Sequence, residues 1–172
     1  MSRRPFRVGR AKTGLGLFAT QRIRKRAFIV RYSGRRITNE EAERREARGA
    51  RYMYELDKKY TLDGSSRRNL GRYANHSCRP NAESDVVKGK VIIRATRTIK
   101  PGQEITYHYG KDYYAAYIGK ARCKCITCTL RRSRERLARK KRAERKKRAA
   151  QRMRAEKRTC AQRRKPRAGK RK

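Results

Sequence analysis

Short apolar runs separated by turn residues fill the first 130 residues of the chain. Residues 27–32 (A-F-I-V-R-Y) form a continuous run typical of a buried strand, residues 51–57 (R-Y-M-Y-E-L-D) alternate imperfectly between polar and apolar, and the turn over residues 98–102 leads into a strand over residues 104–109 (E-I-T-Y-H-Y). Turn residues between apolar stretches predict one hairpin over residues 86–93 and another over residues 51–63. The pattern therefore predicts a mainly β fold built from many short strands.

A single small helix is expected among these strands. Thr38 begins a capping box with Glu41 at the third helical position, and Gly49 supplies a stop. The glycine-rich stretch over residues 12–20, K-T-G-L-G-L-F-A-T, predicts a turn that leads into a strand. Strands and helices do not alternate regularly along the chain, which excludes a Rossmann-type fold.

Positive charge changes the picture after residue 130. The 172 residues carry 54 Lys and Arg against 14 Asp and Glu, a formal net charge of +40. Residues 131–172 hold 23 of these basic residues and 3 of the acidic ones, with hardly any large apolar side chain. Because such a segment cannot build a core, we expect one domain before residue 130 and a basic tail, residues 130–172, that is helical or disordered.

Neither a membrane span nor a leader sequence is expected. No stretch approaches about 18 apolar residues, and the N-terminal M-S-R-R-P-F-R has no apolar run behind its charges. Five cysteines in a reducing compartment argue for metal ligands or free thiols. We therefore expect an intracellular protein with no membrane partner, in the cytoplasm or nucleoid of a bacterium, or in the nucleus or on a chromosome of a eukaryote or host.

The densest cluster of candidate chemistry lies in residues 69–81, N-L-G-R-Y-A-N-H-S-C-R-P-N. It combines an Asn-His pair, a cysteine and an Arg-Pro-Asn turn, in a chain with only two histidines and five cysteines. Its R-Y-A-N-H-S-C-R-P-N resembles the signature of the SET-domain protein lysine methyltransferases. Further stretches resemble that family's other motifs in the family's order: G-L-G-L-F (14–18), R-Y-S-G (31–34), T-L-D-G (61–64), P-G-Q-E-I-T-Y-H-Y (101–109) and a post-SET cysteine cluster C-K-C-I-T-C (123–128).

The resemblance implies a fold and a domain organisation. The fold would be a SET domain of several short β-sheets, in which the N-H-S-C segment is threaded in a knot-like manner. The SET domain would cover residues 6–110, a post-SET cysteine-containing segment would cover residues 111–129, and the basic tail would follow over residues 130–172.

The resemblance also implies an activity, the transfer of a methyl group from S-adenosylmethionine to a lysine side chain of a protein. Tyr109 matches the family's essential active-site tyrosine, and Tyr32 matches another tyrosine of the lysine channel. Tyr107 matches the position that limits the number of methyl groups added, and a tyrosine there favours mono- or dimethylation. Tyr107 and Tyr109 are two positions apart, so a continuous strand would place them on one face.

Cofactor-contacting positions follow from the same motifs. The G-x-G segment would offer backbone groups to the methionine part of S-adenosylmethionine, and Asn75 and His76 would hold its adenine and amino-acid ends, largely through the backbone. Arg72 would face the carboxylate, and Tyr52 would pack on the cofactor. The full set implied is Gly14, Leu15, Gly16, Leu17, Tyr52, Arg72, Asn75, His76 and Tyr109.

Simpler explanations exist for each of these residues taken alone. Alternating tyrosines in a strand are most often core packing, a lone G-x-G is most often an ordinary turn, and His76 could be a structural hydrogen bonder. Two departures from the family pattern also stand out. His108 replaces the usual Asp between the two tyrosines, and Arg31 stands where an acidic residue commonly precedes the channel tyrosine.

The cysteine spacing suggests a metal site. Cys123, Cys125 and Cys128 form C-x-C-x2-C, which offers three ligands on one small loop, one short of a tetrahedral structural zinc. On spacing alone, metal ligands and free thiols remain equally open. The resemblance assigns the fourth ligand to Cys78, so that four thiolates would hold a structural Zn²⁺. Cys160 lies in the tail and fits no ligand set.

Three functions are compatible with the whole sequence. The first is S-adenosylmethionine-dependent methylation of lysine in a histone-like, ribosomal or other basic protein. The second is a catalytically weak SET-fold module that mainly binds nucleic acid, and the third is a basic architectural protein. In each case residues 131–172 would bind DNA or RNA without sequence preference, because their dense positive charge lacks stacking aromatic side chains.

Overall fold

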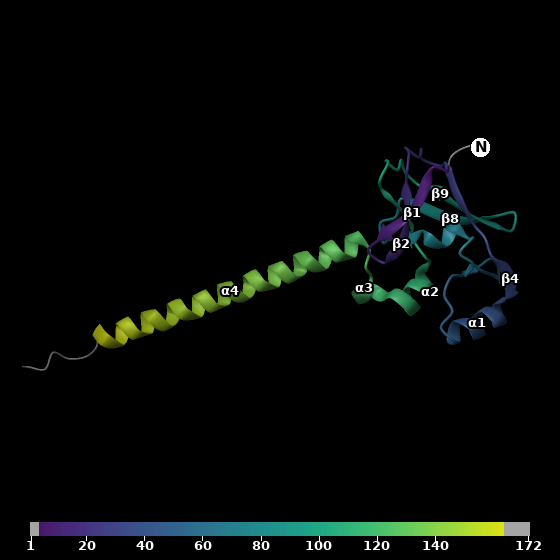
Figure 1. Cartoon of the computed structure of the whole chain (residues 1–172). Helices are drawn as coiled ribbons and strands as arrows, with labels where there is room; N and C mark the ends of the chain where they lie inside the picture. Colours follow the sequence, from purple (N-terminus) through teal and green to yellow (C-terminus); the bar gives the residue numbers. More distant parts are fainter. Residues whose placement is uncertain (1–3, 164–172) are drawn as a thin grey trace, which may run out of the picture. The chain divides into compact units, whose positions relative to one another are not determined.

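Strands connected by short turns make up most of the chain before residue 110 (Figure 1). The computed structural model describes residues 4–163, and side chains up to residue 157. The strands are β1 (Phe6–Ala11), β2 (Gly14–Ala19), β3 (Phe28–Tyr32), β4 (Arg35–Thr38), β5 (Met53–Glu55), β6 (Tyr60–Asp63), β7 (Asn75–His76), β8 (Ala82–Val87), β9 (Lys90–Ala95) and β10 (Glu104–Tyr107). The mainly β fold expected from the hydrophobic pattern is confirmed.

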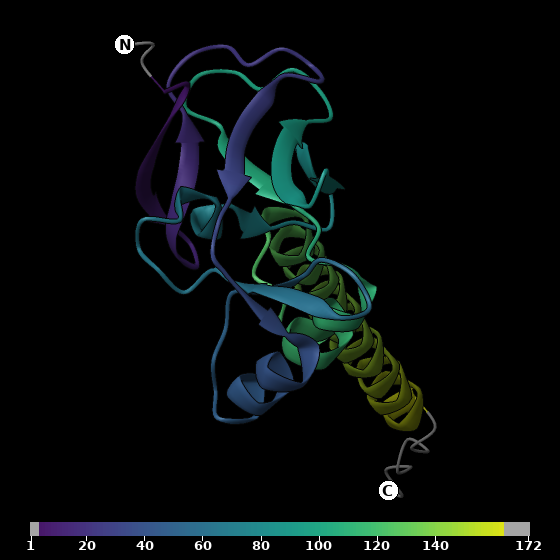
Figure 2. The same cartoon turned by 90° about the vertical axis from the view of Figure 1, so that its right-hand side faces the viewer.

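Three small sheets arise from these strands and can be followed in Figure 2. Their strand orders are β1-β2-β10-β7, β3-β9-β8 and β4-β6-β5. The hairpins predicted over residues 86–93 and 51–63 are confirmed as the antiparallel pairs β8–β9 and β5–β6. In the turn between β8 and β9, Lys88 and Gly89 both have positive φ, at 49° and 70°. These backbone angles suit the twist of a tight hairpin.

The buried core lies among these sheets. Leu17, Ile93, Ile99 and Ile105 have no exposed surface and come from β2, β9, the segment before β10, and β10 itself. Removing such side chains from water is the main favourable term in folding. The core therefore fixes β10 against β2, which is the place where the candidate motifs meet.

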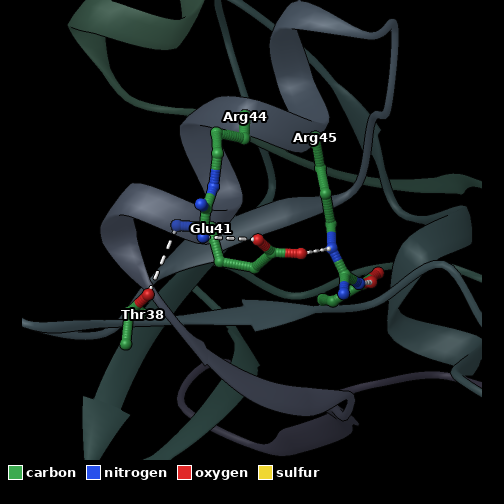
Figure 3. A network of polar contacts seen from close by, with 5 residues as sticks. Thr38, Glu41, Arg44 and Arg45 are labelled. Carbon is green, nitrogen blue, oxygen red and sulfur yellow. Dashed lines mark hydrogen bonds and ion pairs between the residues drawn. The ribbon is translucent and has the colours of Figure 1, made fainter.

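The predicted helix forms as α1 (Asn39–Ala47) and follows Thr38 directly. The Thr38 hydroxyl accepts a hydrogen bond from the Glu41 N–H at 3.3 Å (Figure 3). The Glu41 carboxylate forms ion pairs with Arg44 and Arg45. Arg45 forms a second ion pair, with Asp63 of β6, at 2.6 Å. The cap and the bridge to β6 explain why this short, charged helix begins at residue 39 and lies against the third sheet.

Short helical segments not expected from the sequence follow Gly110. They are α2 (Lys111–Tyr113), the π-helical η2 (Tyr114–Ile118) and α3 (Gly119–Arg122), and the 3-10 turn η1 (Leu70–Tyr73) was not expected either. The first three are too short to show an apolar period in sequence. The long helix α4 (Ile126–Arg163) agrees with the helical alternative for the basic tail. In α4, Ala, Arg, Lys and Glu are strong helix formers, and ion pairs join Arg131 to Glu135 and Arg152 to Glu156.

The chain divides into two compact units between Thr129 and Leu130. The first unit contains the sheets, and the second contains most of α4. Part of the tail, including the side chain of Cys160, lies outside the described side chains. Among the described residues, no helix is long and apolar enough to cross a membrane.

Candidate active site and metal centre

A short parallel pairing brings the Asn-His segment against the tyrosine strand. β7 pairs with β10 so that Asn75 lies opposite Thr106 and His76 opposite Tyr107. The Ser77 N–H then donates to the Tyr107 carbonyl at 3.0 Å. Two motifs about 30 residues apart in the sequence are thereby joined backbone to backbone.

Asn69 anchors the start of residues 69–81, the stretch that contains the N-H-S-C motif and is called the threaded segment after the family expectation. Its side chain is 1% exposed, accepts from the Ser33 N–H at 3.0 Å and donates to the Gly64 carbonyl at 3.1 Å. A Cβ added at Gly71 would lie 2.8 Å from the Cα of Tyr32, so the chain passes in close contact with the end of β3. Sequence analysis assigned no role to Asn69, although a buried amide with two backbone partners is a typical positioning residue.

Asn81 anchors the other end of the same segment. Its amide nitrogen donates to the Glu104 carbonyl at 2.8 Å, and its amide oxygen accepts from the Thr106 N–H at 2.9 Å. The Asn81 side chain therefore makes two hydrogen bonds to the backbone of β10 of the kind that a paired strand would make. This position was also missed, because its motif suggested only a turn.

The three candidate catalytic tyrosines lie together. Tyr107 and Tyr32 are 6% and 3% exposed, and Tyr109 is half-buried. The Tyr107 and Tyr109 rings lie 4.9 Å apart between centroids. The Tyr109 hydroxyl donates to the Ala74 carbonyl at 3.0 Å, and the Tyr32 hydroxyl donates to the Tyr52 carbonyl at 2.6 Å.

The strand that carries the candidate tyrosines is shorter than the sequence predicts. β10 ends at Tyr107, so Tyr109 lies beyond the ladder and its placement comes from side-chain and η1 contacts. Tyr113 packs edge-on against Tyr109 at 5.5 Å, and Tyr117 follows at 4.6 Å from Tyr113. Sequence analysis missed both of these aromatic residues, whose only signal was the tyrosine-rich run K-D-Y-Y-A-A-Y.

Burial makes these phenols harder to ionise. It raises the pKa of Tyr32, Tyr107 and Tyr109 well above the ordinary value of 10.0, and the neighbouring tyrosines reinforce the shift. A neutral phenol can both donate and accept a hydrogen bond. The three tyrosines therefore form an aromatic cluster whose hydroxyl groups are polar but carry no negative charge at physiological pH.

The G-x-G turn is held tightly against Asn75. The Asn75 amide donates to the Leu15 carbonyl at 3.1 Å and to the Glu104 carboxylate at 2.7 Å. A Cβ added at Gly16 would lie 2.8 Å from that carboxylate and 3.0 Å from the Asn75 amide. Gly14 has a φ of 110°, which only glycine adopts readily. Leu17 is fully buried, backbone included, because it pairs with Val8 of β1 on one side and with Ile105 of β10 on the other.

Arg72 holds an unsatisfied donor near the candidate cofactor residues. Its guanidinium lies 3.8 Å above the Tyr52 ring and donates to the Ser65 carbonyl. Its Nε is buried and has no hydrogen-bond partner among the described residues. A buried donor without a partner costs free energy, so this nitrogen retains an unused hydrogen-bonding capacity.

His76 lies half-buried between the aromatic residues and the cysteines. The imidazole packs edge-on against Tyr109 at 5.4 Å and against His108 at 4.8 Å. Burial, and to a smaller degree His108, lower the pKa of His76 to about 4, so the ring is neutral at physiological pH. His108 itself is exposed, unlike the buried Tyr107 beside it.

Four cysteine sulfurs converge as the spacing and the resemblance suggest. The sulfurs of Cys78, Cys123, Cys125 and Cys128 all lie within 4.8 Å of one another, and Cys78 is 3.8 Å from Cys123 and 3.5 Å from Cys128. A Zn–S bond of about 2.3 Å in a tetrahedron separates sulfurs by about 3.8 Å. The donor set and its spacing therefore fit one structural zinc.

The thiols also differ in acidity. Burial raises the pKa of Cys78 to about 12, whereas the backbone N–H groups of Cys78 and Cys128 outweigh burial and lower the pKa of Cys125 to about 7. A bound divalent cation would favour the thiolate form of all four, because metal ligation requires deprotonated sulfur.

Comparison with known proteins decides the family. The model of the SET domain family matches residues 14–110. The chain belongs to the SET-domain family. The matched range includes the G-x-G turn, the threaded segment and both tyrosines of the 101–109 motif, but it ends before the three clustered cysteines of the post-SET segment.

Among similar proteins, histone-lysine N-methyltransferase SUV39H2 of Xenopus tropicalis is 36% identical over 111 residues, which cover 56% of this chain and 27% of that protein. Human histone-lysine N-methyltransferase 2D is 37% identical over 110 residues, covering 58% of this chain and 2% of that protein. A structure of ctPRC2 in an autoinhibited conformation bound to S-adenosylmethionine superposes with a TM-score of 0.57 at 27% identity, covering 63% of this chain and 15% of that chain. The SET fold is therefore shown by sequence and by structure, while the chain spans only a small part of these relatives.

Proposed function

We propose that the chain is a protein-lysine N-methyltransferase that uses S-adenosylmethionine. The observation that carries this proposal is the parallel pairing of β7 with β10, which brings Asn75 and His76 against the strand of Tyr107, next to Tyr109. The bound S-adenosylmethionine would supply an electrophilic methyl group. Support also comes from the family match and from relatives named histone-lysine N-methyltransferases.

The tyrosines would prepare the lysine. A lysine ammonium has an ordinary pKa of about 10.4 and no free lone pair, so it must lose its proton before it can react. A buried aromatic lining penalises the charged form of the amine. Tyr109 and Tyr32 would orient the neutral amine through their hydroxyls, and Tyr107 would limit the space around it, which favours mono- or dimethylation.

The cofactor would be held by residues that the fold brings close to these tyrosines. Backbone groups of the G-x-G turn and of Asn75 and His76 would contact it, and the unsatisfied Nε of Arg72 would receive its carboxylate. The proposed set is Gly14, Leu15, Gly16, Leu17, Tyr52, Arg72, Asn75, His76 and Tyr109. The rate would come mainly from positioning.

Zinc would have a structural role. Cys78 joins the threaded segment to the post-SET cysteines, so a zinc bound there would tie residues 123–128 to the segment that carries Asn75 and His76. Four cysteine ligands would fill a tetrahedral coordination shell, so no position would remain open for catalysis.

The substrate and the partners follow from charge and from the relatives. A histone-like, ribosomal or other basic lysine-containing protein is proposed as substrate, in the nucleus or on chromosomes if the source is eukaryotic, or in the cytoplasm or nucleoid if it is bacterial. The basic tail would bind DNA or RNA and so concentrate the enzyme where such proteins gather. Along the described part of α4, the side chains are mostly exposed.

The test is incubation with methyl-labelled S-adenosylmethionine and a panel of histones, bacterial histone-like proteins and ribosomal proteins, analysed by mass spectrometry. We expect methyl-lysine on at least one panel member, with a loss of about 100-fold or more in Tyr109→Phe, by analogy with removal of one transition-state hydrogen-bond donor. S-adenosylmethionine binding should persist in the variant. Tyr60→Phe, on β6, is the matched control and should keep full activity; equal activity in both variants would remove Tyr109 from its role.

A catalytically weak SET-fold module that mainly binds nucleic acid is the second candidate. The density of basic side chains along α4 favours it, and so do the departures at Arg31 and His108. The same experiment separates the two functions. Wild-type protein that binds nucleic acid but neither binds S-adenosylmethionine nor labels any lysine would support this second candidate.

A further inference from the structure

We propose that the His76 side chain is a positioning residue that links the cysteine cluster to the backbone of Tyr109. Its Nδ1 accepts a hydrogen bond from the Tyr109 N–H at 3.4 Å, and its Nε2 lies 3.4 Å from the Cys78 sulfur. The inference rests on the proposed function, because it assigns the imidazole a task in the same active site. It goes beyond the backbone contact to cofactor assigned to His76 above.

The two contacts fix the tautomer. A backbone N–H can only donate, so the Nδ1 that faces Tyr109 must be unprotonated. In a neutral imidazole the proton then resides on Nε2. That N–H points at Cys78, and a metal-bound thiolate is a better hydrogen-bond acceptor than a free thiol. His76 therefore bridges the two sites with one donor and one acceptor.

Tyr109 has a particular need for this bridge. β10 ends at Tyr107, whose carbonyl receives the Ser77 N–H, so the strand ladder does not hold the backbone of Tyr109. The imidazole of His76 binds that backbone instead and also packs edge-on against the Tyr109 ring. The orientation of the active-site phenol thus depends on the position of this ring.

The ring is in turn held from several directions. The His76 backbone is fixed opposite Tyr107 by the β7–β10 pairing. The imidazole also packs against Tyr114 at 5.0 Å, and the Tyr114 hydroxyl lies 3.9 Å from the Cys78 sulfur. A change at the cysteine cluster would therefore reach Tyr109 through a single intervening side chain.

Two substitutions separate the two contacts. In His76→Asn the amide oxygen can take the place of Nδ1 and accept from Tyr109, but the side chain is too short to reach Cys78. In His76→Gln the terminal amide nitrogen can take the place of Nε2 and donate to the sulfur, while the Tyr109 contact is lost. His76→Phe keeps an aromatic ring and loses both contacts, and Tyr60→Phe, on β6, is the control.

The measurements on the full chain are zinc retention against a chelator, the dissociation constant of S-adenosylmethionine, and kcat and KM for the best panel substrate. We expect His76→Phe to weaken zinc retention by about 10–100-fold, as loss of a partner of a metal ligand typically does, and to lower kcat more than it raises KM. His76→Asn should weaken zinc retention and keep more of kcat, His76→Gln should do the reverse, and Tyr60→Phe should match wild type.

Different failures have different meanings. Wild-type zinc retention and kcat in a folded His76→Phe protein would overturn the positioning role. Equal loss of both properties in the Asn and Gln variants would overturn the two-sided bridge, since only a general structural defect acts equally on both. Absence of methyl transfer in wild type would overturn the proposed function instead, and zinc retention would then still test the contact with Cys78.

Discussion

At the scale of single residues, neighbouring aromatic side chains of the site differ in burial and therefore in the roles that they can take. Tyr107 is enclosed, whereas Tyr109 is half-buried and donates to the Ala74 carbonyl. A hydroxyl on an enclosed ring takes up space as well as making hydrogen bonds. Tyr107 is therefore the residue at which a small change in volume should alter the product rather than the rate.

The first prediction follows from that space. In Tyr107→Phe the hydroxyl is removed and the ring remains, which leaves room for a larger substituted amine near Tyr109. We expect the product distribution to shift toward a higher methyl count, with overall turnover changed by less than about 10-fold. Mass spectrometry of the methylated lysine over time checks this; an unchanged mono- and dimethyl distribution would show that Tyr107 does not limit the product.

The second prediction concerns alkaline pH. The pKa values of Tyr32, Tyr107 and Tyr109 are raised by burial, so above pH 10 the unfolded chain releases protons that the folded protein retains. Stability from these groups is fully present below pH 10 and falls as the pH rises toward their folded pKa values, by about 1.4 kcal/mol per pH unit for each tyrosine.

Ultraviolet titration of tyrosinate tests this shift. At least these three of the ten tyrosines should ionise later in the folded protein than in denaturant, and chemical denaturation should show the matching loss of stability. A titration with all ten tyrosines near pH 10 in the folded protein would contradict the burial of the cluster.

Sequence identified many of these residues because their chemistry is concentrated in short motifs. Asn75, His76 and Cys78 lie within four positions, and the structure places the first two beside the strand of Tyr107 and Cys78 beside the other cysteines. The amides of Asn69 and Asn81 could not be predicted as anchors, since their partners are backbone groups of strands distant in sequence. Only the fold specifies such partners.

At the scale of elements, turn chemistry was the most reliable guide. Lys-Gly-Lys predicted the β8–β9 hairpin and Thr38 predicted the start of α1, because each signal acts within four residues. The helical segments between Lys111 and Arg122 lacked such a signal, and they pack through tyrosines whose neighbours come from elsewhere in the chain. For residues after 130, composition left helix and disorder open, and α4 follows the helical propensity.

The third prediction concerns the link between two elements, the threaded segment and the post-SET loop. Purified protein should contain one zinc per chain, and Cys78→Ser should lose most of it, since three sulfurs on one loop hold the metal less well than four. Cys160→Ser is the matched control and should retain the metal. Elemental analysis of both variants decides the matter, and a folded, active wild type without zinc would contradict the assignment.

At the scale of the whole molecule, the chain consists of a domain with a buried core and a second unit in which none of the described side chains, residues 130–157, is buried. The first 130 residues carry 31 basic and 11 acidic residues, and the last 42 carry 23 and 3, so both parts have the same net charge at very different density. Only the first part matches the SET family. The basic tail should therefore affect where the enzyme acts and leave its chemistry unchanged.

The fourth prediction tests this separation. Neutralising Arg139, Lys140, Lys141 and Arg142 to Gln removes four charges from an exposed stretch of α4. Because binding to a phosphate backbone releases counterions, the slope of log affinity against log salt should become shallower by up to about 4 on double-stranded DNA, with weaker binding at every salt concentration. Fluorescence anisotropy on duplexes of unrelated sequence measures both quantities.

The same variant should methylate a short free peptide at the wild-type rate, because peptide capture needs only the first unit. It should methylate a substrate already bound to nucleic acid more slowly, since the local concentration supplied by the tail is reduced. A variant that loses activity on the free peptide would show that α4 contributes to the active site. A variant that keeps wild-type salt dependence would show that these four charges do not contact nucleic acid.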